Sequence, residues 1–199
     1  MLTILGKSTS INVRKVLWTC AEIGVPYQHE LHSSEIARLN PNAMVPVIID
    51  DGQALWESNT ICRYLAGQHG RSDLLPTEAM PRAQVEKWMD WQATELNNAW
   101  RYAFMALVRG SAAHADAAAI AHSAGEWNRL MTMLDAQLAT TGAWVCGDSF
   151  TLADIVLGLS FNRWRCTPMT RPALTALQAW AERLDQRPAW RQHGANGIP

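Results

Sequence analysis

The hydrophobic pattern of the chain changes near Gly70, and this change restricts the folds that the sequence can adopt. Before Gly70, short apolar runs typical of buried strands alternate with amphipathic helical segments. Beyond it, strand signals disappear and apolar residues recur at the three- and four-residue spacing of helices. We therefore predict an α/β unit at residues 1–70, a linker at residues 71–80 and an all-α helical bundle at residues 81–199.

The first unit predicts the element order β-α-β-α-β-β-α. A helix that connects the first two strands implies that these strands are parallel. Asp51-Gly52 between two apolar runs indicates a hairpin, and the last helix should begin near Glu57-Ser58. The predicted strands are residues 2–5, 26–31, 45–49 and 53–56, the first helix spans residues 12–23, and a short polar stretch covers residues 33–39.

Two long helices dominate the predicted bundle. Apolar residues at helical spacing from Val85 to Leu107 predict one helix that ends at Gly110. A second helix is predicted by the steps of four and three between Ile120 and Leu138.

Thr151 and Asp154 have the spacing of a reciprocal capping box at the start of an apolar helix over residues 152–161. We interpret this pair as a folding device and not as catalytic machinery. A final amphipathic helix is predicted between Pro172 and Pro188.

The charge of the chain is nearly balanced, with 17 basic and 18 acidic residues and a net charge of −1. No long run of like charge is present, so nothing indicates a nucleic-acid or membrane partner. The first five residues form neither a basic leader nor a long apolar stretch, and we therefore expect a cytoplasmic location.

The cysteines and histidines do not have the spacing of a metal site, and no metal is expected. The four cysteines, Cys20, Cys62, Cys146 and Cys166, include no Cys-x-x-Cys pair. Free thiols, mostly buried, are favoured over a disulfide or a metal site.

Two segments together indicate a site that could hold a small thiol peptide. Ser10 and its neighbours place hydroxyl groups at a predicted helix start, where free N–H groups and the helix dipole favour an anion. Val45-Pro46 precedes a predicted strand, and Glu57-Ser58 begins a later helix.

The combination of these motifs with the Thr151 to Asp154 capping box resembles the cytosolic glutathione transferases. The resemblance covers essentially the whole chain, and serine at position 10 is similar to the serine-type, theta-like bacterial members. It implies a thioredoxin-like fold for the first unit, glutathione as a co-substrate and a two-fold homodimer.

The resemblance implies a site for the peptide part of glutathione. Glu57 would face the α-amine, and the hydroxyl and N–H of Ser58 would bind the adjoining carboxylate. Val45, followed by Pro46 in a cis bond, would pair its backbone with the cysteinyl part.

Ser10 is the candidate donor to the glutathione sulfur. Its hydroxyl can donate a hydrogen bond to the thiolate, and the helix N-terminus adds free N–H groups and positive dipole at the same place. Asn12 is the second candidate and Thr9 the third, while Ser8 competes through its position in the same loop. The alternative for Ser10 is a helix N-cap that contacts no ligand.

A partner for the glycine carboxylate is missing from the expected place. Many relatives have a Lys, Gln or His between the Asn-Pro and Val-Pro pairs, whereas this chain has Asn42-Ala43-Met44. His32 or Arg38 could substitute, and the alternative for both is a solvated surface side chain.

A hydrophobic electrophile should bind between the two units, against the first long helix of the bundle. Each residue proposed there could instead belong to the bundle core. The candidates are Asn97, Trp100, Arg101, Tyr102, Phe104, Met105 and Arg109, with Trp164 and Arg165 closing the pocket from the other side.

These features predict an enzyme, a glutathione transferase, whose bound thiolate attacks an electrophilic small molecule, a chemistry suited to detoxification. Two alternatives stay open. One is a glutathione-dependent disulfide reductase or isomerase that uses the same site. The other is a non-enzymatic glutathione-binding or protein-interaction module.

Overall fold

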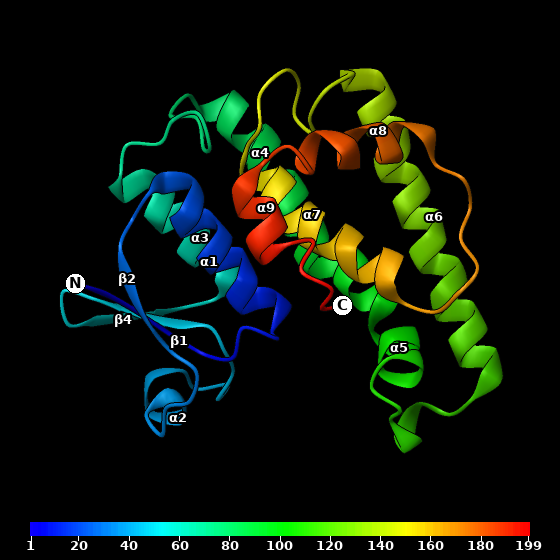
Figure 1. Ribbon diagram of the computed structural model, residues 1–199, viewed down its shortest axis with the longest axis horizontal. Helices are drawn as coiled ribbons and strands as arrows, with labels where there is room; N and C mark the ends of the chain where they lie inside the picture. Colours follow the sequence, from blue (N-terminus) through cyan, green and yellow to red (C-terminus); the bar gives the residue numbers. More distant parts are fainter.

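A computed structural model describes residues 1–199, and its first part is built on a four-stranded mixed sheet in the order β2-β1-β3-β4. Strands β1 and β2 are parallel, as predicted, and β3 is antiparallel to both β1 and β4. Helices α1 and α3 cover one face of the sheet, and α2 lies on the other side (Figure 1). The elements are β1 (Leu2–Leu5), α1 (Ile11–Ile23), β2 (Tyr27–Glu30), α2 (Ile36–Leu39), β3 (Val47–Asp50), β4 (Gln53–Trp56) and α3 (Ser58–Gln68).

Strand β3 begins at Val47, two residues later than predicted. The preceding residues form a loop that Asn40 holds, because its side chain donates to Met44 O at 2.8 Å and accepts from Asn42 N at 3.0 Å. Pro46, which follows in the chain, has no N–H to give to a strand ladder. The apolar run at Val45 therefore belongs to the loop and not to the sheet.

The second part of the chain is entirely helical. The first predicted long helix is present as α4 and α5, joined without a break by a π-helical segment, and it ends at Leu107. A short helix at the end of the chain, α9, was not predicted. The elements are α4 (Ala79–Trp91), η1 (Gln92–Leu96), α5 (Asn97–Leu107), η2 (Ala112–His114), α6 (Ala117–Thr141), α7 (Leu152–Cys166), α8 (Thr175–Leu184) and α9 (Pro188–His193).

Helix α7 runs through the centre of the molecule, and its start is fixed by the predicted capping residues (Figure 1). The Asp154 carboxylate accepts from the backbone N–H of Thr151 at 2.9 Å, from Val145 N at 3.0 Å and from Trp180 Nε1 at 2.9 Å. Burial raises the pKa of Asp154 to about 6, while these hydrogen bonds act in the opposite direction. All of these partners belong to the helical half, which agrees with a folding role.

The two halves meet where α1 packs against α7 and α9. The Trp18 ring of α1 lies 5.2 Å from the ring of Trp190 and 6.0 Å from that of Phe150, measured between centroids. A Cβ on Gly158 of α7 would approach Trp18 to 3.0 Å, so a glycine allows the two helices to come close here.

A buried polar chain crosses the same boundary. The Lys15 ammonium of α1 donates to Asn59 Oδ1 of α3 at 3.1 Å and to Gln92 Oε1 of the π-helical segment at 2.7 Å. Gln92 in turn donates to Ser160 Oγ of α7 at 3.0 Å. Burial lowers the pKa of Lys15 to about 8. Because the ammonium has no carboxylate partner, its hydrogen bonds require one fixed arrangement of the four elements.

None of the helices combines the length and apolar content needed to cross a membrane. The four cysteines are unpaired, and no group of three or more His, Cys, Asp or Glu side chains is arranged to hold a metal ion.

Candidate functional site

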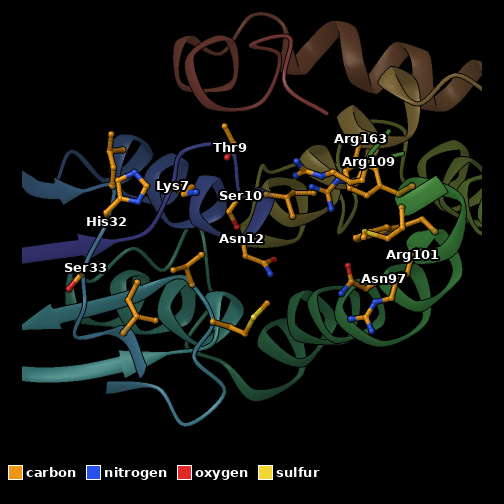
Figure 2. A pocket seen from close by; sticks show the side chains of 18 of the residues that line it. Lys7, Thr9, Ser10, Asn12, His32, Ser33, Asn97, Arg101, Arg109 and Arg163 are labelled. Atoms are coloured by element: carbon orange, nitrogen blue, oxygen red, sulfur yellow. The ribbon is translucent and has the colours of Figure 1, made fainter. Parts of the chain in front are cut away.

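A cleft of about 1110 Å³ opens between the thioredoxin-like half and the helical half. Figure 2 shows Ser10 and Asn12 on one side of it and Arg101, Arg109 and Arg163 on the other. Its lining residues are Lys7, Thr9, Ser10, Ile11, Asn12, Leu31, His32, Ser33, Ser34, Ile36, Met44, Val45, Asn97, Trp100, Arg101, Phe104, Met105, Arg109, His114 and Arg163.

Ser10 is the N-cap residue of α1 by backbone position, but its hydroxyl makes no capping hydrogen bond. Its carbonyl oxygen accepts from Arg14 N at 3.0 Å, and its N–H donates to Lys7 O at 3.0 Å. The backbone of Ser10 is therefore satisfied while its half-buried hydroxyl lines the cleft. The interpretation of Ser10 as a simple side-chain cap has no support in this geometry.

The other candidates for the sulfur contact are also in the cleft. Asn12 is half-buried and Thr9 is exposed, and both line the space beside Ser10 (Figure 2). Ser8 is exposed and does not line it. Helix α1 has no acidic residue in its first turn, so no carboxylate opposes an anion at this helix start.

Gly6 brings the Ser10 loop against Val45. Its φ is +132°, and a Cβ at this position would lie 2.7 Å from the Val45 side chain and 2.8 Å from that of Val13. Val45 lines the cleft, and its bond to Pro46 is cis, as the family resemblance implied. Glycine is therefore required where the two site loops touch.

Glu57 and Ser58 lie at the start of α3, and neither they nor Pro46 line the cleft itself. Glu57 is exposed and adopts a φ of +73°, a conformation that is unfavourable for a residue with a side chain. Ser58 is buried. Strained non-glycine residues of this kind are often found where a ligand is held.

The two candidates for the missing carboxylate partner are placed differently. His32 lines the cleft. Arg38 lies outside it and pairs with Glu35 on the surface of the α2 turn, where both side chains are more than half exposed. Both side chains are exposed, and the difference between them is that His32 lines the cleft and Arg38 does not.

All of the electrophile candidates on α5 and just after it line the cleft except Tyr102. Trp100, Arg101 and Phe104 line the cleft, together with Asn97, Met105 and Arg109. Tyr102 does not line it, and its ring packs against that of His114, with 4.9 Å between the ring centroids.

Trp164 and Arg165 do not close the cleft, contrary to the prediction. Trp164 is buried against α6, where its Nε1 donates to Asn128 Oδ1 at 2.8 Å. Helix α7 continues beyond residue 161 to Cys166, so Trp164 lies within the helix and not after it. The preceding residue, Arg163, occupies the cleft instead.

The sequence did not indicate Lys7, His114 or Arg163 as lining residues. With Arg101 and Arg109, the cleft contains four Lys or Arg side chains and no Asp or Glu among its 20 lining residues. Such a cleft attracts anions and disfavours cations. The signal that could have revealed Arg163 is an arginine that follows the largely apolar segment 152–161, although Arg165 shares this position.

Comparison with known proteins accounts for this architecture. The protein-family model of the glutathione S-transferase N-terminal domain matches residues 9–68 of the sequence. The family model of the glutathione S-transferase C-terminal domain matches residues 96–188. The chain belongs to the glutathione S-transferase family. Glutathione S-transferase GstB of Escherichia coli strain K12 is 39% identical over 96% of this chain and 97% of its own length. Glutathione S-transferase 3 of Zea mays is 29% identical over 96% of this chain and 92% of its own length.

A solved glutathione S-transferase has nearly the same fold. The theta class enzyme of Xanthomonas axonopodis pv. citri, crystallised with glutathione bound, aligns with a TM-score of 0.89 and 37% identity. The alignment covers 97% of this chain and 96% of that one. The resemblance to this family and the fold class predicted from the sequence are both confirmed.

Proposed function

We propose that this glutathione S-transferase family member is a glutathione transferase in which Ser10 stabilises the thiolate of bound glutathione. One observation carries the assignment of Ser10. Its hydroxyl lines the cleft at the start of α1 and has no capping hydrogen bond to give up. Asn12 and Thr9 are the nearest substitutes in the same loop.

Three effects would favour the anionic sulfur at this place. The Ser10 hydroxyl can donate a hydrogen bond to it, the N-terminus of α1 presents positive dipole, and the lining cations raise the local potential. A hydrogen bond to an ionised group contributes about 1.5 to 3 kcal/mol, which lowers a thiol pKa by about one to two units. The thiol proton leaves to solvent, and a thiolate forms at neutral pH.

The peptide part of glutathione would bind to the thioredoxin-like half. The Val45 backbone would pair with the cysteinyl residue, Glu57 would bind the α-amine, and Ser58 would bind the adjoining carboxylate. The strained Glu57 backbone, with its φ of +73°, supports this arrangement. His32 is the favoured partner for the glycine carboxylate because it lines the cleft.

The electrophile would bind to the helical half, where Trp100 and Phe104 offer apolar surface opposite Ser10. The sulfur attacks the electrophilic carbon and the leaving group departs with its electron pair. Glutathione itself is the nucleophile, so no covalent enzyme intermediate is needed. The protein contributes orientation and anion stabilisation.

The Ser10→Ala variant tests the proposal. We expect turnover to fall about tenfold to a hundredfold, because one hydrogen bond to the thiolate is lost. The ultraviolet absorbance of bound thiolate, titrated with pH, should show a raised thiol pKa, while calorimetry should show nearly unchanged glutathione affinity. Ser8→Ala is the matched control, since Ser8 is exposed and does not line the cleft.

Unchanged turnover in Ser10→Ala would contradict the assignment. Parallel Asn12→Ala and Thr9→Ala variants would then show which residue contacts the sulfur. A screen of disulfides and isomerisable thiol adducts alongside alkylating electrophiles separates a transferase from a reductase or isomerase.

We further propose that the protein works as a cytoplasmic homodimer in the detoxification of electrophiles. The family relationship supports this proposal. Light scattering coupled to size-exclusion chromatography tests the dimer, and a mass equal to one chain of 22.1 kDa would refute it.

A further inference from the structure

The helical wall of the cleft contains an arginine with no counter-charge. Arg163 is only 3% exposed, and its Nε atom is buried without a hydrogen-bond partner. Its charge interacts with that of Lys15 and is opposed by Arg14 and Arg109, so all of these neighbours are cations. Burial, followed by Arg14 and Arg109, lowers the pKa of Arg163.

Other arginines near the boundary between the halves have partners. Arg187 pairs with Glu22 at 2.6 Å, and Arg14 donates to Asn196 Oδ1 at 3.0 Å and to Ile198 O at 2.9 Å. A guanidinium removed from water without such partners is costly. An anion that enters the cleft would supply the partner that Arg163 lacks in the protein.

Two aromatic rings hold Arg163 in position. Its guanidinium carbon lies 4.6 Å from the centroid of Trp100 and 4.1 Å from that of Phe104. The guanidinium carbon of Arg109 lies 5.4 Å from the same Phe104 ring. Stacking on ring faces leaves the N–H groups at the guanidinium edge free, and this edge matches the two oxygens of a carboxylate.

We propose that the electrophilic substrate carries a carboxylate, which binds to Arg163 and Arg109 while its apolar body lies against Trp100 and Phe104. This inference rests on the proposed function and specifies its second substrate. An uncharged hydrophobic electrophile would leave Arg163 buried without a partner, whereas a carboxylate neutralises it.

The carboxylates of glutathione do not compete for this position in the proposed arrangement. Glu57, Ser58 and His32 all belong to the thioredoxin-like half, while Arg163 lies on α7 and Arg109 follows α5. Figure 2 shows Arg163 and Arg109 across the cleft from Ser10. The reactive sulfur and the carboxylate of the second substrate would therefore be bound by opposite walls.

A matched pair of aryl chlorides tests the proposal. The first is a chloronitrobenzoate with chlorine ortho to the nitro group and para to the carboxylate, and the second is its uncharged amide. With either compound the thiolate sulfur bonds to the ring carbon, the carbon–chlorine bond breaks, and chloride leaves with the electron pair. Each kcat/KM is divided by the uncatalysed rate constant with glutathione, which removes the electronic difference between the two rings.

We expect the wild-type protein to favour the benzoate by this corrected ratio. Arg163→Gln and Arg109→Gln should each reduce the preference about tenfold or more, with less than a twofold change in the KM for glutathione. Arg109 is exposed, so its variant should fold even if the variant at buried Arg163 does not. Arg191→Gln is the control for net charge, because Arg191 is exposed on α9 outside the cleft and should leave the preference unchanged.

A binding measurement gives a readout independent of turnover. Calorimetry with the two purified conjugates should show tighter binding of the carboxylate conjugate to the wild-type protein, and this difference should disappear in Arg109→Gln. No preference for the benzoate in the wild type, or equal slowing of both compounds in the variants, would overturn the proposal. Equal slowing with a raised thiol pKa would mean that these arginines act on the sulfur.

Activity with the amide shows whether a negative result refutes the carboxylate site alone or the proposed function as well. Conjugation of the amide that depends on Ser10, without any preference for the benzoate, would refute the carboxylate site alone. Absence of conjugation with both compounds, together with failure to bind glutathione, would refute the proposed function itself.

Discussion

The two walls of the cleft are built in different ways. The thioredoxin-like wall consists of loops and a helix start, and its main groups are the backbone around Val45 and the small side chain of Ser10. The helical wall consists of large side chains that project from α5 and α7, including Trp100, Phe104 and Arg163. One wall depends on chain geometry, and the other depends on side-chain identity.

This difference separates two kinds of recognition. Backbone groups keep their positions as long as the fold is kept, so the thioredoxin-like wall suits a ligand that does not vary, such as glutathione. The exposed side chains of the helical wall, such as Arg101 and Arg109, can be exchanged with little effect on the fold, so this wall can be adapted to different electrophiles. Substitutions in the first wall should therefore affect stability and glutathione binding, and those in the second should affect substrate preference.

The largest expected effect follows from disturbing the backbone of the thioredoxin-like wall. Gly6→Ala places a methyl group within 3 Å of the Val45 and Val13 side chains, at a backbone φ of +132°. We expect a loss of about 2 to 4 kcal/mol in the free energy of unfolding, measured by urea titration, together with weaker glutathione binding.

Gly52→Ala is the matched control for this variant. Gly52 also has a positive φ, of +79°, but no atom lies within 4 Å of an added Cβ. It should cost about 1 kcal/mol through backbone strain alone and should leave glutathione binding unchanged. Equal effects of the two substitutions would show that the contact between Gly6 and Val45 does not support the site.

A smaller effect should distinguish the two candidates for the glycine carboxylate. His32→Ala is expected to raise the KM for glutathione about threefold to tenfold, because an exposed hydrogen bond to a carboxylate is lost. Arg38→Ala should change it less than twofold, since Arg38 faces Glu35 outside the cleft. Steady-state kinetics with glutathione varied provides the measurement, and a larger effect from Arg38 would reverse this order.

The smallest predicted effect concerns Lys15, whose hydrogen bonds link the two halves of the molecule. It is measured through the pH dependence of stability. Lys15 has a pKa of about 8 in the folded protein, below its ordinary value near 10.5, so the unfolded chain binds more protons between these values. The free energy of unfolding should therefore rise with pH relative to Lys15→Met, by about 1 kcal/mol between about pH 7 and pH 9. Parallel pH profiles for the two proteins would show that Lys15 keeps its ordinary pKa.

The fold could be predicted from the sequence because its determinants are local. The alternation of strands and helices, the hairpin at Gly52 and the capping residues Thr151 and Asp154 all act within a few residues of the chain. The six-residue helix α9 was missed because it is too short to show a helical period.

The candidate site could be predicted only in part, for a physical reason. Ser10 and Val45 are placed in the cleft by local motifs, a helix start and an X-Pro bond. Arg163 could not be distinguished from Trp164, because residues 152–164 of α7 are all buried and no apolar face shows which side meets the cleft. His32 and Arg38 differ only through the path of the loop between β2 and β3, which hydrophobic periodicity does not encode.

The number of residues in the π-helical segment Gln92–Leu96 limits the insertions and deletions that this protein can accept. In it the Asn97 N–H bonds to Gln92 O, five residues back, so the α4–α5 rod holds one residue more than a regular helix of the same path. Loss of one residue here would turn α5 by about 100° relative to α4. Either Gln92 would leave Lys15, or Trp100 would leave the cleft. The helical wall therefore tolerates exchange of its exposed side chains but not a change in the number of residues at this turn.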